Sequence, residues 1–318
     1  MGVFTRLGPD QLASVLGAWG LAGARAEGVP EGSVNTWYRV DAGGRRFYLR
    51  VDERDDDAAV TTELAVLDAL RALPVPRLVP TRDGRAMTRL GEKPCLLFEA
   101  LDGTSHPPPE LTPARLASLG EVVAAMHAAP VPAGLAPHRF HPRRVVEALY
   151  APVRDRTRAE HPEAAAALDA AFEGGWAAYE FASLPRAVVH GDLFHDNVLY
   201  AGDAVTGVLD FEAAGEGARL FDLAVAVHAL CFDAAARRFV TARASSLLDA
   251  YAARASIAEA ERAAWPGLLR FAGARFLVTR LRDFEYRPGA REAGTWKDFR
   301  EYLHHLAALG EVDGLLGG

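Results

Sequence analysis

Residues 190–212 read HGDLFHDNVLYAGDAVTGVLDFE, and this stretch decides the fold. The two valines at 188–189 predict a short buried strand that runs into it. Residues 198–209 then read as two short strands joined by a turn, because β-branched and aromatic residues flank an Ala-Gly-Asp triplet. Such a hairpin folds back and returns Asp210 toward Asn197. We therefore expect two carboxylates and one amide to converge at the end of the hairpin.

The polar residues of this stretch are the types that phosphoryl transfer requires. A transferred phosphoryl group carries charge that a divalent cation neutralises, and Mg²⁺ takes hard oxygen ligands. Asn197 and Asp210 supply an amide oxygen and a carboxylate for this metal. A separate carboxylate must accept the proton of the attacking hydroxyl, and Asp192 is the candidate base. The alternative is that Asp192 caps a turn and Asn197 satisfies backbone groups. It does not explain why both metal-ligand positions occur with a hairpin between them.

Two departures from the protein-kinase catalytic loop indicate the class of acceptor. That loop reads HRDxxxxN, and here Gly191 replaces the arginine that would pair with a phosphorylated activation loop. Only residues 211–221 separate Asp210 from Asp222, a segment too short for an activation loop with a peptide-docking platform. We therefore expect the acceptor to be a small molecule that carries a hydroxyl group.

At these residues the chain resembles the aminoglycoside phosphotransferase and choline kinase superfamily, whose signature is HGDxxxxN followed by an I-D-F/W/P stretch. Within that superfamily it is most similar to homoserine kinase type II. The similarity extends from about residue 2 to residue 305 and includes the segments 2–5, 31–36, 193–199, 275–281 and 297–299.

The resemblance implies a two-lobed, protein-kinase-like α+β fold. The N-terminal lobe, residues 1–100, would hold a small antiparallel sheet and bind ATP. The C-terminal lobe, residues 101–318, would be mostly helical and carry the catalytic and acceptor-binding residues. The implied reaction is Mg²⁺-dependent phosphorylation of L-homoserine to O-phospho-L-homoserine, a step of threonine biosynthesis. The alternatives are an aminoglycoside, choline or amino-sugar phosphotransferase of the same fold, and a catalytically silent nucleotide-binding protein.

Length, charge and cysteine content exclude several other classes. A chain of 318 residues with a net charge of −7 has no global electrostatic support for binding nucleic acid. No apolar run approaches the roughly twenty residues of a membrane-spanning helix, and no basic and apolar export signal opens the sequence. Two cysteines, Cys95 and Cys231, cannot form a disulfide framework. We expect a cytoplasmic protein with no membrane or nucleic-acid partner.

Hydrophobic periodicity and turn residues predict the elements of both lobes. In the small lobe we expect a helix capped by Asp10, a hairpin over 36–51, a helix over 61–73 and a strand over 95–99. In the large lobe we expect a helix capped by Thr112 and further helices over residues 142–156, 162–180, 219–230, 234–252, 257–285 and 296–309.

A glycine-containing turn over residues 28–33 precedes the first predicted strand. Backbone N–H groups of such a turn can approach phosphates, and Gly32, Ser33 and Asn35 are the candidates for phosphate contact. A plain hairpin turn is the alternative, because the three glycines of a GxGxxG loop are missing.

Other nucleotide-binding candidates lie on the strands and the helix that follow. Arg50 stands where kinases have a lysine, and Glu63 on the next helix is its expected partner. The alternative is a surface ion pair of little energetic consequence. Residues 97–100 resemble the hinge between kinase lobes, where main-chain groups around Glu99 would pair with adenine.

Two further groups of residues complete the predicted site. His127, His190 and Asp222 are expected to support the catalytic loop without reacting. The ammonium of an amino-acid acceptor would bind protein carboxylates, for which Glu212 and Glu216 are the candidates. The acceptor's own carboxylate would bind an arginine, for which Arg275 or Arg280 is the candidate. Each of these four has an alternative interpretation as a solvated helix or loop charge.

Overall fold

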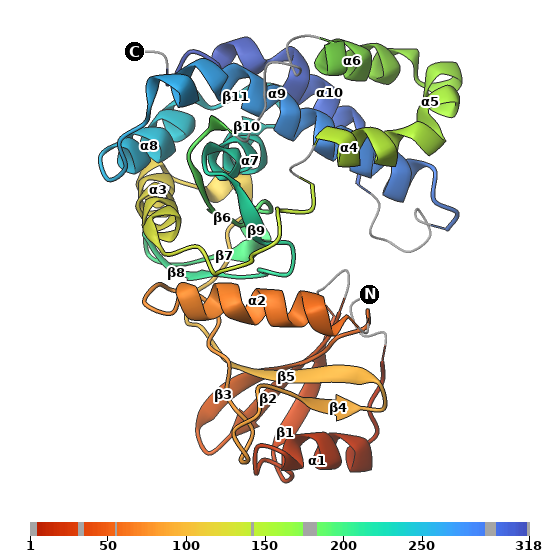
Figure 1. Cartoon of the computed structure of the whole chain (residues 1–318), viewed down its shortest axis with the longest axis vertical. Coiled ribbons are helices and arrows are strands. Elements are labelled where there is room, and N and C mark those ends of the chain that lie inside the picture. The colour runs from red at the N-terminus through yellow and green to blue at the C-terminus, as the bar shows by residue number, and fades with distance from the viewer. Residues whose placement is uncertain are drawn as a thin grey trace. The chain divides into compact units, whose positions relative to one another are not determined.

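A computed structural model describes residues 5–30, 35–54, 56–140, 143–173, 183–289 and 297–316. It divides into two compact units (Figure 1). The first comprises Met1–Arg71 with Val75–Leu101, and the second comprises Ala72–Pro74 with Asp102–Gly318. This division falls next to the expected boundary at residue 100.

The first unit is built on a five-stranded antiparallel sheet in the order β1-β2-β3-β5-β4. Helices α1 and α2 lie on opposite faces of it (Figure 1). The strands are β1 (Arg25–Val29), β2 (Thr36–Ala42), β3 (Arg45–Val51), β4 (Thr88–Leu90) and β5 (Lys93–Glu99), and the helices are α1 (Pro9–Gly17) and α2 (Asp57–Ala69).

Strand alternation explains how this sheet is held. The turn between β2 and β3 consists of Gly43 and Gly44, whose φ angles of 57° and 75° suit the tight hairpin turn that glycine favours. Alternate residues of β2, β3 and β5 then face one apolar core together with side chains of α1. Its members are Val15, Leu16, Trp19, Tyr38, Val40, Phe47, Leu49, Val51, Cys95 and Leu97.

Three expectations for this unit were wrong in detail. Helix α1 begins at Pro9 after Gly8, so Asp10 lies in its first turn and is not its cap. Helix α2 starts at Asp57, four residues before the predicted start, because the Asp56 carboxylate accepts the N–H of Ala59 at 2.9 Å. Strands β1 and β4 were not predicted, and residues 28–29 belong to β1 and not to a turn.

The second unit is mostly helical. Its helices are α3 (Pro113–Ala128), α4 (Arg143–Tyr150), α5 (Arg154–Glu160), α6 (Pro162–Glu173), α7 (Leu220–Cys231), α8 (Thr241–Ala252), α9 (Glu259–Arg280) and α10 (Arg300–Ala307). Three two-stranded sheets accompany them: β6 (Arg186–Val189) with β9 (Gly215–Ala218), β7 (Val198–Ala201) with β8 (Ala204–Val208), and β10 (Phe232–Asp233) with β11 (Arg238–Phe239). Helix α7 is buried along nearly its whole length, with α3, α8 and α9 around it (Figure 1).

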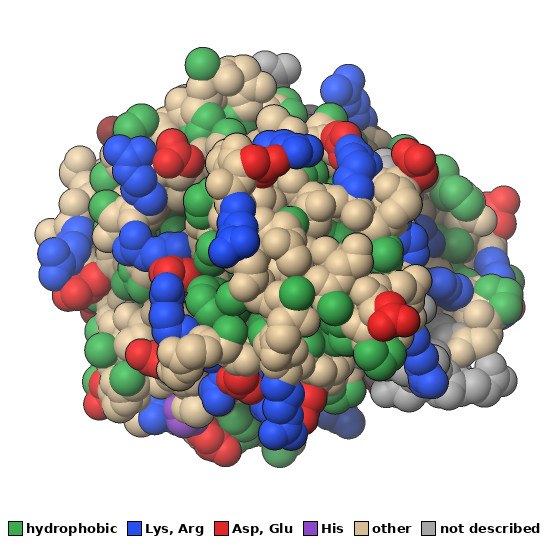
Figure 2. Space-filling model, turned by 90° about the horizontal axis from the view of Figure 1, so that it is seen from below, with side chains coloured by type: hydrophobic (Ala, Val, Ile, Leu, Met, Phe, Trp, Pro, Cys, Tyr) green, Lys and Arg blue, Asp and Glu red, His purple; other side chains and the backbone are tan. Residues whose placement is uncertain are grey.

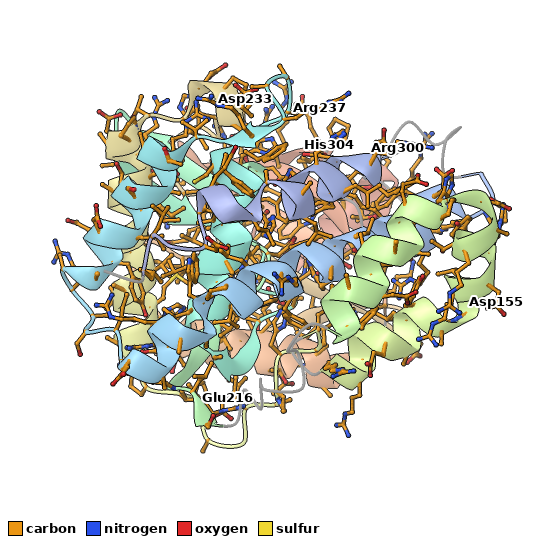
Figure 3. The ribbon with its side chains drawn as sticks, turned by 90° about the horizontal axis from the view of Figure 1, so that it is seen from above. Asp155, Glu216, Asp233, Arg237, Arg300 and His304 are labelled. Carbon is orange, nitrogen blue, oxygen red and sulfur yellow. The ribbon has the colours of Figure 1, made fainter. Side chains whose placement is uncertain are left out.

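Several helix boundaries differ from the predicted ones. The predicted helix 142–156 is two helices, since a short 3₁₀ turn at Ala151–Val153 separates α4 from α5. The helix predicted from residue 234 begins at Thr241, because the β10–β11 hairpin precedes it, with Asp233 and Arg237 at the surface in Figure 3. The helix predicted over 257–285 is α9 followed by a π-turn, Leu281–Glu285. The ends of the helices predicted over 162–180 and 296–309 lie partly outside the described residues.

The distribution of charged, apolar and cysteine side chains agrees with what the sequence indicates. Figure 2 shows basic and acidic side chains interspersed on the face that it presents. No helix of the described residues is both long and apolar enough to cross a bilayer. Cys95 and Cys231 are free and buried.

Candidate active site

A buried carboxylate organises the start of the catalytic loop. Asp222, in the first turn of α7, is fully buried and accepts the N–H of His190 at 2.8 Å and that of Gly191 at 2.6 Å. His127 of α3 contacts the same carboxylate through Nε2 at 3.1 Å. Burial alone would raise the pKa of Asp222, but the hydrogen bonds and the nearby histidines lower it overall. The first two residues of the loop are therefore held by hydrogen bonds to a buried carboxylate.

The two histidines fix their own orientations through their neighbours. His190 Nε2 donates to the carbonyl of Leu209 at 2.7 Å, so its Nδ1 accepts the N–H of Asp192 at 3.2 Å. His127 donates to Asp222 and accepts from the hydroxyl of Tyr251 at 3.1 Å. His190 thus joins the loop to the end of the β7–β8 hairpin, and both ring nitrogens of each histidine are engaged by protein groups.

Gly191 is required by two features of the loop. Its φ of 73° lies in the left-handed region, which residues with a side chain disfavour. A Cβ atom at this position would also lie 2.0 Å from Nε2 of His138, which is fully buried beside it. Close packing of His138 therefore explains why glycine stands where protein kinases have arginine.

Asp192 is presented by a main chain that is held on both sides. Its N–H binds His190, and its carbonyl accepts Nδ2 of Asn197 at 2.9 Å. The side chain remains 36% exposed, so a solvated acceptor can reach it. Nη1 of Arg275 lies 3.8 Å from Oδ1 of Asp192. A rigid, accessible carboxylate is the arrangement that a general base requires.

The two predicted metal ligands lie at the two ends of the hairpin. The N–H of Leu209 donates to the carbonyl of Asn197 at 2.8 Å, which brings the main chain before Asp210 close to that of Asn197. Asp210 is exposed and has a φ of 62°, a strained conformation that is concentrated at functional sites. Since Nδ2 of Asn197 is engaged, its Oδ1 is the atom left to bind a cation.

These oxygens fit Mg²⁺ as kinases use it. The described residues contain no cluster of three or more His, Cys, Asp or Glu side chains that could hold a metal alone. One amide oxygen and one carboxylate are the protein's share where phosphate oxygens and water supply the other ligands.

Arg50 and Glu63 form a buried, bidentate ion pair. The two Nη atoms of Arg50 donate to the two oxygens of Glu63 at 2.9 and 2.7 Å, and both side chains are buried. The Arg50 guanidinium also lies over the rings of Trp37 and Phe98. Asp52 is 3.7 Å from it. The pair therefore lies in the interior and not at the surface, as the alternative had assumed.

The other predicted nucleotide-binding residues are placed unevenly. Gly32 and Ser33 lie outside the described residues. Asn35 is buried and its Oδ1 accepts the N–H of Glu53 at 2.9 Å, so it ties the start of β2 to the residues that follow β3. The N–H of Glu99 donates to the carbonyl of Arg77 at 2.9 Å, so this N–H is not the adenine donor.

The four acceptor candidates have different surroundings. Glu216 lies on β9 at the outer edge of the unit (Figure 3), and its carboxylate binds Nε of Arg186 at 2.8 Å. Arg280 donates to Glu301 at 2.5 Å and to the carbonyl of Asp298 at 2.7 Å. Both therefore serve structural pairs. Glu212 is partly buried just after Asp210. Arg275 is buried beside Asp192.

Three residues that hold other site residues in place were not predicted from the sequence. Tyr251 fixes His127, His138 packs against Gly191, and Phe140 lies against Arg275 with 4.4 Å between the guanidinium and the ring centre. None belongs to a motif, and all three are far in sequence from the residue they contact. The sequence carries no local signal for them.

Known proteins match this chain in sequence. Residues 25–268 match the model of the phosphotransferase enzyme family. The homoserine kinase of Methylobacillus flagellatus is 36% identical over 320 residues, covering 98% of this chain and 97% of that protein. The homoserine kinase of Rhodospirillum rubrum is 32% identical over 321 residues, covering 99% and 98%.

Solved structures share the fold at low identity. A spectinomycin phosphotransferase in complex with ADP and spectinomycin has a TM-score of 0.67 at 11% identity, covering 90% of this chain and 93% of that one. A microcompartment-associated aminopropanol kinase has a TM-score of 0.62 at 22% identity, covering 95% and 98%.

The fold and the loop geometry define a phosphotransferase with a protein-kinase-like, two-lobed α+β architecture. The chain belongs to the phosphotransferase enzyme family. The fold class and the kinase activity expected from the sequence are confirmed. It is an ATP-dependent enzyme that phosphorylates an alcohol.

Proposed function

We propose that this enzyme phosphorylates the side-chain hydroxyl of L-homoserine, giving O-phospho-L-homoserine and ADP. The observation that carries the chemistry is Asp192, whose main chain is fixed through His190 and Asn197 while its carboxylate stays accessible. The choice of acceptor is supported by relatives named homoserine kinase that are 31–36% identical over most of their length.

Asp192 accepts the hydroxyl proton as the acceptor oxygen attacks the γ-phosphorus of ATP. The bond to the bridging oxygen then breaks and ADP leaves. Asn197 and Asp210 would hold Mg²⁺, which would neutralise charge on the phosphate oxygens. Asp222 and His190 hold the loop in place and do not exchange protons with the substrate. We further propose that Arg50, held by Glu63, pairs with nucleotide phosphates, as the kinase lysine does. Free, buried Cys95 and Cys231 suit a cytoplasmic location.

The test is ADP formation with ATP and Mg²⁺ against a panel of L-homoserine, choline, amino sugars and aminoglycosides, with the product identified by ³¹P NMR. We expect turnover with L-homoserine alone. Turnover only with another acceptor would retain the kinase mechanism and remove homoserine. Bound nucleotide without any turnover would favour the silent alternative.

The Asp192→Asn variant tests the base. We expect its kcat to fall by about 10³-fold, in the middle of the range for general base catalysis, while calorimetric ADP binding is unchanged. The matched control is Asp196→Asn, because Asp196 is exposed in the same loop. If Asp192→Asn kept its activity, Asp192 would be removed from the mechanism.

A further inference from the structure

Arg275 occupies an unusual position for an arginine. It lies within α9, is only 5% exposed, and is covered by aromatic rings. The centre of its guanidinium is 4.4 Å from the ring centre of Phe140 and 3.8 Å from that of Phe276. Burial lowers the pKa of Arg275 to about 10, opposed by Asp192, and the group therefore stays charged at neutral pH. A charge is thus held in largely apolar surroundings.

The hydrogen-bonding capacity of Arg275 is not met by its neighbours. Among the described residues, neither Nε nor Nη1 has a hydrogen-bond partner, and the 3.8 Å separation from Asp192 is too long for one. Arg50 and Arg280, the other buried arginines considered above, each donate to a carboxylate. A buried charged donor without an acceptor is unfavourable, and such a group in a native fold requires an explanation.

We propose that Arg275 binds the carboxylate of the acceptor and makes the enzyme selective for hydroxy amino acids over amino alcohols. This inference rests on the proposed function and deepens it. With two aromatic rings against the guanidinium, its N–H donors are the groups left for a ligand, and they match a carboxylate.

The position of Arg275 suits a small acceptor. Phe194, two residues after Asp192, packs edge-on against Phe276 at 5.0 Å, so the aromatic wall is tied to the catalytic loop. Phe140 follows a segment whose His138 N–H donates to the carbonyl of Glu216 at 3.0 Å. Because Nη1 of Arg275 lies 3.8 Å from Oδ1 of Asp192, one short molecule can place its hydroxyl at Asp192 and its carboxylate at Arg275. Arg280, the other arginine that the sequence offered, is occupied by Glu301.

The test compares two acceptors that differ only in the carboxylate. L-homoserine carries it, and 3-aminopropan-1-ol is the same molecule without it. We expect wild-type kcat/KM to favour L-homoserine by about 100-fold, the usual order for a charged hydrogen bond. Arg275→Met should lower kcat/KM for L-homoserine by a similar factor and change that for 3-aminopropan-1-ol by less than about threefold. Arg275→Lys, which keeps the charge but loses the planar fork, should recover part of the loss.

Controls separate this role from a structural one. Arg270→Met removes an exposed arginine of the same helix and should leave both acceptors unaffected. L-2-aminobutyrate, which has the ammonium and carboxylate but no hydroxyl, should inhibit the wild type competitively and inhibit Arg275→Met far less. The melting temperature of each variant shows whether it is folded.

Each outcome decides the proposal. An equal loss of kcat/KM with both acceptors would mean that Arg275 acts on Asp192 or on the transferred phosphoryl group, and would overturn the proposal. An Arg275→Met variant with unchanged kcat/KM would overturn it as well. So would a wild type that does not distinguish L-homoserine from 3-aminopropan-1-ol. If the wild type turns over neither acceptor, the proposed function fails. Calorimetric binding of L-homoserine that Arg275→Met abolishes would still support the carboxylate site, and absence of binding to the wild type would overturn both.

Discussion

Gly191 shows how a single residue sets the geometry of the active site. Its peptide N–H binds Asp222, its φ is positive, and His138 fills the space that a side chain would need. In a Gly191→Ala variant either His138 or the loop must move, which displaces Asp192 from its place beside the acceptor. We expect kcat/KM to fall by at least about 100-fold, because small misplacements of catalytic groups are costly. Steady-state kinetics and urea denaturation measure the two effects.

Gly202 provides the matched control for this substitution. It also has a positive φ, 62°, but a Cβ there meets nothing within 4 Å. Gly202→Ala should therefore destabilise the fold by about 1 kcal/mol, the penalty of a left-handed alanine, and leave kcat unchanged. Equal activity losses in the two variants would show that backbone strain, and not contact with His138, explains Gly191.

Whether a site residue could be predicted depends on whether its partners lie nearby in the sequence. Asp192, Asn197 and Asp210 were predicted from one loop and one hairpin that are continuous in the sequence. Arg50 and Glu63 were paired correctly because a strand and the next helix of a familiar motif carry them. Asn35, Glu216 and Arg280 were assigned to ligands, yet the structure gives each a partner within the protein, since burial and ion pairing depend on neighbours that the sequence pattern does not reveal. His138 and Phe140 belong to no sequence motif that would have indicated their roles.

At the scale of elements, the crossing of α3 and α8 depends on Gly120. A Cβ at this position would lie 2.2 Å from the carbonyl oxygen of Leu247 and 3.1 Å from the N atom of Tyr251, both in the backbone of α8. Backbone cannot be displaced as a flexible side chain can, so Gly120→Ala should push the helices apart. We expect a loss of about 2 kcal/mol in the free energy of unfolding, in the range of overpacked cores, measured by urea titration.

Activity should fall with stability in this variant, because α3 carries His127 and α8 carries Tyr251, which bind each other at 3.1 Å. Gly17→Ala is the control, since Gly17 ends α1 and its Cβ would meet nothing within 4 Å. That variant should be neutral or more stable by up to about 1 kcal/mol, as alanine favours helix. A Gly120→Ala protein as stable as Gly17→Ala would contradict the close crossing.

Elements were predicted well where the local sequence pattern carries the signal. The β2–β3 and β7–β8 hairpins and helix α3 have strong periodicity, turns or caps. Strand β9 reads Gly-Glu-Gly-Ala and has no β-forming residue, and it is a strand only because β6 pairs with it in antiparallel register. Strands β1 and β4 are likewise defined by their neighbours in the sheet. Such elements depend on tertiary context, which no local pattern contains.

At the scale of the whole molecule, a buried histidine pair makes stability depend on pH. His228 of α7 donates through Nε2 to the carbonyl of Leu269 at 2.8 Å, and its Nδ1 lies 3.1 Å from Nδ1 of His305 of α10. Both rings are buried, and Tyr302 and Phe239 pack around His228. Burial and the neighbouring His305 lower the pKa of His228 to about 3, and burial also lowers that of His305. His228 is therefore neutral in the folded protein.

The sign of the effect follows from proton binding. Below about pH 6.5 the unfolded chain protonates His228 and the folded chain does not, so stability is lost as pH falls from this value toward 3. For His228 alone the loss between pH 7 and pH 5 is about 2 kcal/mol. We expect His228→Gln to unfold with a shallower pH dependence over this interval, in urea titrations at each pH. His304→Gln, next to His305 but partly exposed, should keep the wild-type slope. Equal slopes in the wild type and His228→Gln would show that acid sensitivity arises elsewhere in the fold.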